Sequence, residues 1–127
     1  MVPASLTNTY DETLALLIEA RDYLSRNRGL DGMGMDPADH FRFNRESMRL
    51  ISRLTEAMAW LMVRRAVVAG EIDDAEARAP ERRLGNHDVC LAEPEDVDGR
   101  FPEGMKTLLF RSRSLYERVA RLDDLLG

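Results

Sequence analysis

The chain has 127 residues, of which 44% are apolar and 32% charged, and its formal net charge is −5. This balance is typical of one soluble globular domain and excludes an intrinsically disordered chain. The acidic total disfavours nucleic acid as the main partner, because phosphate binding needs surplus lysine and arginine. The single cysteine, Cys90, and the lack of a signal sequence indicate a reducing cytoplasm. The longest apolar run is too short to cross a membrane.

Three segments have the apolar spacing of amphipathic helices, and no segment alternates with the period of a strand. They cover residues 6–28, 37–69 and 102–126. We therefore expect one all-α domain over residues 1–127. Its helices would form an antiparallel up-down-up three-helix bundle with a long central helix and a long acidic connector, 70–101.

Local signals set the bounds of these elements. Asp36 followed by Pro37 is a helix start, and Gly29 and Gly70 are expected helix stops. Residues 71–98 carry ten acidic side chains against three arginines. Asp73 opens a capping pattern that predicts a short helix before Pro80, and turn residues follow. We expect the rest of this connector to be only partly ordered.

The two halves of the central helix differ. In the first half the apolar side and the arginine side are opposite, and the apolar side contains Leu50, Ile51, Leu54, Thr55, Met58 and Leu61. The second half is apolar nearly all round, and Trp60, Val63 and Val67 fall on the arginine side. An all-round apolar helix must be buried on every side. These three residues are therefore candidates for a homodimer interface or for burial under the connector. Arg65 is predicted to point to the core, where it would need an acidic partner.

The arginine side of the central helix is a candidate docking surface. It contains Arg45, Arg49, Arg53 and Arg64, with Trp60 among them. Arginine and tryptophan are common in protein interfaces, and a basic-aromatic stripe can also bind nucleic acid or an acidic peptide. The alternative is a solvated helix face that the acidic connector partly covers.

Residues with catalytic or metal-binding chemistry are sparse. His40, His87 and Cys90 could form a metal site only if folding brought them together, and their spacing matches no zinc pattern. No carboxylate pairs with a histidine at helical spacing, and Cys90 has no neighbouring cation in the sequence. The sequence therefore predicts no enzyme activity, no cofactor and no metal.

Three stretches together resemble a known family. They are LIEARDYL at 17–24, ESMRLISRLTEAMAWLMVRRAVVAGEI at 46–72 and LYERVARLDDLL at 115–126. In this combination and order they resemble the alphaproteobacterial regulator of CtrA degradation (RcdA), a family first catalogued as the uncharacterised domain family DUF1465. The resemblance covers nearly the whole chain.

The resemblance implies a non-enzymatic, homodimeric helical-bundle adaptor that works in the cytoplasm with the ATP-dependent protease ClpXP. A response-regulator-like factor would prime the protease. The adaptor would then recruit cargo, including a cyclic-di-GMP-binding effector and the cell-cycle regulator CtrA. Some family members continue into a polar tail implicated in cargo delivery, whereas residues 124–127 still follow the helical stripe. We therefore expect the connector to take part in recognition.

Overall fold

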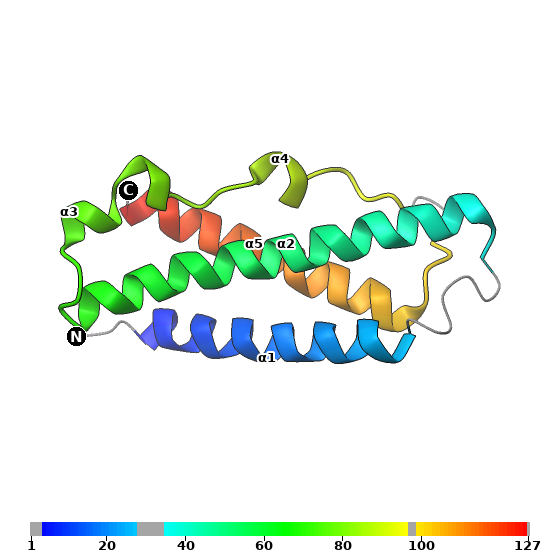
Figure 1. Cartoon of the computed structure of the whole chain (residues 1–127), viewed down its shortest axis with the longest axis horizontal. Coiled ribbons are helices and arrows are strands. Elements are labelled where there is room, and N and C mark those ends of the chain that lie inside the picture. The colour runs from blue at the N-terminus through cyan, green and yellow to red at the C-terminus, as the bar shows by residue number, and fades with distance from the viewer. Residues whose placement is uncertain (1–3, 28–34, 97–98, 127) are drawn as a thin grey trace.

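The computed structural model describes residues 4–27, 35–96 and 99–126, and these ranges are helical with no strand. Three long helices, α1 (Ala4–Asn27), α2 (Pro37–Val68) and α5 (Glu103–Leu126), lie side by side along the molecule (Figure 1). Within the described ranges, none of the helices combines the length and apolar character that a membrane crossing requires.

The observed bounds lie within two residues of the predicted ones wherever the structure describes the chain. The Asp36 side chain accepts a hydrogen bond from the backbone N–H of Asp39 at 2.8 Å, as expected for an N-cap. Gly70 follows α2 with a φ of +76°, a left-handed conformation that favours glycine. The predicted stop of the first helix, at Arg28 and Gly29, lies outside the described residues.

The predicted up-down-up arrangement is wrong in the direction of the last helix. Along α2 and α5 the contacts advance together, from Arg53 with Ser112 (3.3 Å) to Trp60 with Asp123 (2.9 Å), so these two helices are parallel. Along α1 and α5 they run in opposite order, with Glu12 on Arg118 and Glu19 on Arg111. The reason is the connector, which returns along the length of the molecule before α5 begins (Figure 1). A long crossover connection can join two parallel neighbouring helices, whereas a short loop joins antiparallel ones.

The connector is more ordered than the sequence predicts. It contains α3 (Asp74–Ala77), a 3-10 turn (Pro80–Arg82) and α4 (His87–Cys90). The predicted cap is confirmed, since the Asp73 carboxylate accepts from the N–H of Glu76 at 2.7 Å. Three of the connector's apolar side chains, on Ala77, Leu84 and Cys90, are buried. These anchors hold the connector against the helices despite its acidic composition.

The core has two parts. One is built around Leu16, Leu50, Leu54, Met105 and Leu115, where all three long helices meet. The other lies beneath the connector, around Trp60, Leu61, Leu84, Cys90 and Tyr116. The connector therefore contributes Leu84 and Cys90 to the second cluster and packs as a fourth element of the bundle.

The prediction that Arg65 points to the core is wrong. Its guanidinium carbon lies on the outside of the bundle, 4.2 Å from the centroid of the Tyr10 ring. Arg64 is buried instead. The buried side of α2 is displaced toward the arginines because α5 and the connector both pack there, while α1 packs on the other flank.

Candidate interaction surfaces

The arginine side of α2 is mostly buried within the single chain. We call it the covered face and define it by Glu46, Arg49, Arg53, Trp60 and Arg64. Arg53 is only 2% exposed. Its Nε donates to the carbonyl of Cys90 in the connector at 2.8 Å, and its Nη1 donates to Leu109 O and Ser112 Oγ in α5. Burial lowers the pKa of its guanidinium, and the nearby carboxylate of Glu46 opposes that effect. This arginine ties three elements together.

Arg49 and Arg45 engage the acidic end of the connector. Arg49 Nη1 lies 2.8 Å from Glu46 Oε1 and 3.6 Å from Glu95 Oε2, and it also donates to the carbonyl of Glu93. Arg45, which is half exposed, reaches Glu95 Oε1 at 3.3 Å. The connector therefore neutralises this part of the stripe with its own carboxylates. The sequence leaves open a docking surface or a helix face partly covered by the acidic connector. The contacts of these arginines agree best with the covered helix face.

Trp60 is 3% exposed and packs under the connector. Its Nε1 donates to Asp123 Oδ1 at 2.9 Å, and Asp123 also accepts from Arg83 Nε and from the N–H of Leu84. The guanidinium of Arg64 lies 5.1 Å from the Trp60 ring centroid and pairs with Asp74 at 3.5 Å.

Val63 and Val67 are half-buried on the same flank, and Val63 borders a small cavity of about 140 Å³ beside Trp60 and Leu84. Of the two predicted environments for these three residues, the structure places Trp60 under the connector. Its burial is complete without a second subunit. The sequence pattern did not identify Asp123 as a buried hydrogen-bond acceptor, since a carboxylate near the end of an amphipathic helix is normally expected to be in solvent.

The opposite side of α2 is apolar and uncovered in the single chain. Met48 is 72% exposed, and Ile51 and Met62 are exposed as well. Between them the outward residues are uncharged and small: Ser52, Thr55, Ala59 and Ala66. On α1, Leu14 and Ile18 are also exposed. We call Leu14, Ile18, Met48, Ile51 and Met62 the open face.

One shallow cavity shows that the two helices contribute to the same face. It measures about 240 Å³ and brings Tyr10 of α1 together with Met62 and Arg65 of α2. Leu14 follows Tyr10 by one helical turn and therefore extends the same side of α1. Exposed apolar patches of this kind mark interaction sites more often than chance.

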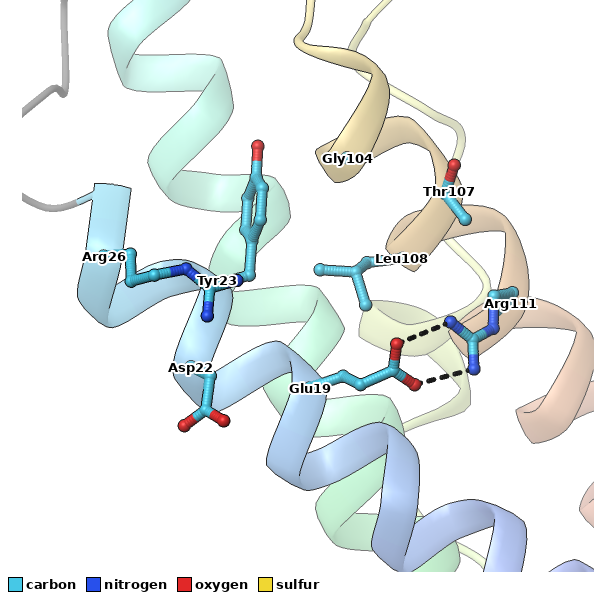
Figure 2. A pocket seen from close by; sticks show the side chains of 8 residues that line it. All are labelled: Glu19, Asp22, Tyr23, Arg26, Gly104, Thr107, Leu108 and Arg111. Atoms are coloured by element: carbon cyan, nitrogen blue, oxygen red, sulfur yellow. Dashed lines mark hydrogen bonds and ion pairs between the residues drawn. The ribbon is translucent and has the colours of Figure 1, made fainter.

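A polar cleft of about 320 Å³ separates α1 from the start of α5 (Figure 2). At one end both Nη atoms of Arg111 bond the carboxylate of Glu19, at 3.1 and 2.8 Å. The hydrogen bond from Arg111 lowers the pKa of Glu19. Gly104 allows the close approach of Tyr23, because a Cβ there would lie 2.6 Å from Tyr23 Cε2. The ion pair between Glu19 and Arg111 crosses the cleft and therefore links α1 to α5.

The residues with metal-binding potential are dispersed in the part of the chain that the structure describes. No group of three or more histidine, cysteine, aspartate or glutamate side chains is placed there to hold a metal. His40 lies near the start of α2, and His87 packs edge-on against Tyr116, at a centroid distance of 5.7 Å. Burial raises the pKa of the Cys90 thiol, which disfavours the nucleophilic thiolate.

Comparison with known proteins gives one positive result. No curated protein and no solved structure matches the chain. The family described as "Protein of unknown function (DUF1465)" matches residues 1–127, the whole chain. This match confirms the DUF1465 part of the resemblance seen in the sequence, and the chain belongs to the DUF1465 family.

Proposed function

We propose that this protein is a non-enzymatic, homodimeric adaptor that recruits protein cargo to a ClpXP-type protease. The protease, its priming factor and the cargo class come from the sequence resemblance to the regulator of CtrA degradation. One observation supports an interaction role most directly: α2 carries buried charges on one side and exposed apolar groups on the other.

The open face has the properties of a subunit interface. Leu14, Ile18, Ile51 and Met62 are all more than a third exposed in the single chain, although their side chains favour burial. The small residues between them on α2 let a second helix approach closely. A second copy of the chain is the occupant that best fits, because a two-fold dimer pairs one patch with itself and this patch carries little charge to repel itself.

This assignment replaces the dimer interface that the sequence predicts at Trp60. The indole is already buried beneath the connector, and exposing it would break its hydrogen bond to Asp123. The arginines likewise have intramolecular partners, which argues against a phosphate-binding stripe.

Light scattering coupled to size-exclusion chromatography tests the dimer. The wild-type chain is expected to elute as a dimer at micromolar concentration. The double variant Ile51→Glu/Met62→Glu is expected to be a folded monomer, since each carboxylate would lose its water in the interface. Leu125→Glu is the matched control, because Leu125 is 81% exposed on α5, away from the open face. A monomeric wild type, or a dimeric double variant, would contradict this assignment.

Reconstituted proteolysis tests the adaptor role. Purified ClpXP, its response-regulator-like priming factor and CtrA are mixed with and without this protein, and CtrA is followed on gels. We expect CtrA to be degraded several-fold faster when the protein is present, and the monomeric variant to lose most of that effect. An unchanged rate across CtrA and a cyclic-di-GMP-binding cargo would overturn the adaptor proposal.

A further inference from the structure

A further pocket lies between α2, the end of the connector and α5. It measures about 260 Å³, and its walls include Pro94, Leu109 and Phe110. Phe110 is 76% exposed beside this pocket, which is unusual for a phenylalanine. The pocket is therefore apolar at its opening and open to solvent.

Two buried charged side chains also line this pocket, and each has an unused hydrogen-bonding atom. Arg53 and Glu46 are both 2% exposed. Nε and Nη1 of Arg53 are bonded, but Nη2 has no hydrogen-bond partner among the described residues. Oε1 of Glu46 accepts from Arg49, while Oε2 accepts no hydrogen bond from the described part of the chain. Neither atom is among the fully buried unpaired atoms of the described residues, so both reach the water in the pocket, and a ligand there can replace their hydrogen bonds to water.

The charged side chains at the edge of the pocket already have hydrogen-bond or ion-pair partners. Asp96 accepts from the N–H groups of Arg100 and Phe101, at 2.8 and 3.1 Å. Arg113 donates to connector carbonyls at 2.9 and 3.3 Å, and Lys106 pairs with an acidic neighbour on α5. Glu46 and Arg53 bring one acceptor and one donor of opposite charge into the pocket, which suits a neutral ligand that carries both a donor and an acceptor.

We propose that this pocket binds an extended segment of a partner protein through one bulky apolar side chain and the adjoining peptide groups. The side chain would pack against Leu109 and Phe110. The carbonyl of the residue that carries this side chain would accept from Arg53, and its own N–H would donate to Glu46, because each residue carries one backbone acceptor and one backbone donor, which an extended segment presents on the same side. A free carboxylate fits less well, since it brings two acceptors to a site that holds Glu46. This inference rests on the proposed adaptor function and assigns its cargo contact.

Nuclear magnetic resonance titration tests the proposal with two small probes. N-acetyl-phenylalanine N-methylamide contains the apolar side chain and peptide groups, and N-acetyl-phenylalanine ends in a carboxylate. We expect the amide to bind with a dissociation constant on the order of 1 mM, as its size allows. It should shift the amide signals of residues 109–110 and the Nε–H signal of Arg53. The free acid should bind several-fold more weakly.

Two phenylalanine variants provide a matched comparison. Phe110→Ser should weaken binding of the amide probe at least tenfold. Phe41→Ser is the control, because Phe41 is also exposed but lies on α2 outside this pocket, and it should leave binding unchanged. No localised shifts, equal effects of the two variants, or tighter binding of the free acid would each overturn the proposal.

The same titration on the Ile51→Glu/Met62→Glu variant separates this inference from the proposed dimer. Probe binding should persist there, because both substitutions lie on the open face. If the wild-type chain binds the probe but does not speed CtrA degradation, that result would count against the adaptor proposal alone. Active recruitment by Phe110→Ser at the wild-type rate would count against the pocket alone.

Discussion

The two sides of α2 reverse the usual distribution of residues in a globular protein. On the covered face, arginine, glutamate and tryptophan are buried under the connector and α5. On the open face, methionine and isoleucine meet solvent. Buried charges persist only where partners satisfy them, and here backbone carbonyls and connector carboxylates do so. The comparison teaches that the connector completes the interior of the chain, which leaves the apolar side of α2 exposed in the single chain.

The largest expected effect comes from removing the indole of the covered face. Trp60→Ala should lower the free energy of unfolding by about 3–5 kcal/mol, since it leaves a cavity and unpairs Asp123. Met48→Ala on the open face is the control; made in the monomeric Ile51→Glu/Met62→Glu background, where Met48 stays exposed, it should change the free energy of unfolding by less than about 0.5 kcal/mol. Urea denaturation followed by circular dichroism measures both. Similar losses for the two variants would contradict the contrast between the faces.

A pair of arginines sharpens the comparison. Arg53→Ala should cost about 3 kcal/mol of unfolding free energy, because it leaves Cys90 O and Ser112 Oγ without their donor. Arg65→Ala, on the exterior of the same helix, should cost about 1 kcal/mol or less, the value of an exposed cation–π contact. Urea midpoints compare the two, and a larger loss for Arg65→Ala would reverse the assignment of the buried side.

A pair of adjacent aspartates tests how firmly the connector is held. Asp123→Asn should cost about 1–2 kcal/mol, since the amide replaces an acceptor shared by Trp60, Arg83 and Leu84. It should also speed hydrogen exchange in the connector near Leu84. Asp124→Asn is the control, because its side chain is 81% exposed. Unchanged exchange in Asp123→Asn would show that the apolar anchors alone hold the connector.

The smallest effect is expected at the α1–α5 cleft, away from both faces of α2. Glu19→Gln should cost about 0.2–1 kcal/mol at pH 7, the usual value for an exposed ion pair. Arg111 lowers the pKa of Glu19, so the folded state favours the carboxylate. This contribution is present above the unfolded pKa, near 4.3, and disappears as the pH falls through the lowered folded pKa. Denaturation at pH 7 and at pH 3 should therefore show the difference between wild type and variant only at pH 7.

The sequence predicts the helices well and their arrangement less well. Asp36, Pro37 and Gly70 give the bounds of α2 because capping is a local interaction. The direction of α5 depends on the path of the connector, which local propensity does not encode. The burial of the covered face could not be predicted either, because it also depends on the path of the connector. The partners of Arg53 lie 37 to 59 residues away, and only the fold brings them together.

The candidate surfaces were predicted in part. The surplus of apolar residues on α2 is visible in the sequence, but its location is not. Trp60, which the sequence predicts as a possible interface residue, lies in the interior because Leu84 and Asp123 pack over it. The pocket beside Phe110 combines α2, the connector and α5. A periodicity pattern within one helix cannot reveal a site built from three elements.

The parallel course of α2 and α5 also sets an order of events during synthesis. The contacts that cover Trp60 and Arg53 join residues 63 and 59 positions apart, so they have high contact order. As the chain leaves the ribosome, α1 and α2 can pair while residues 103–126 are still being added. During that interval the covered face and the open face of α2 are both exposed to solvent. The nascent chain is then most prone to aggregation and most in need of a chaperone.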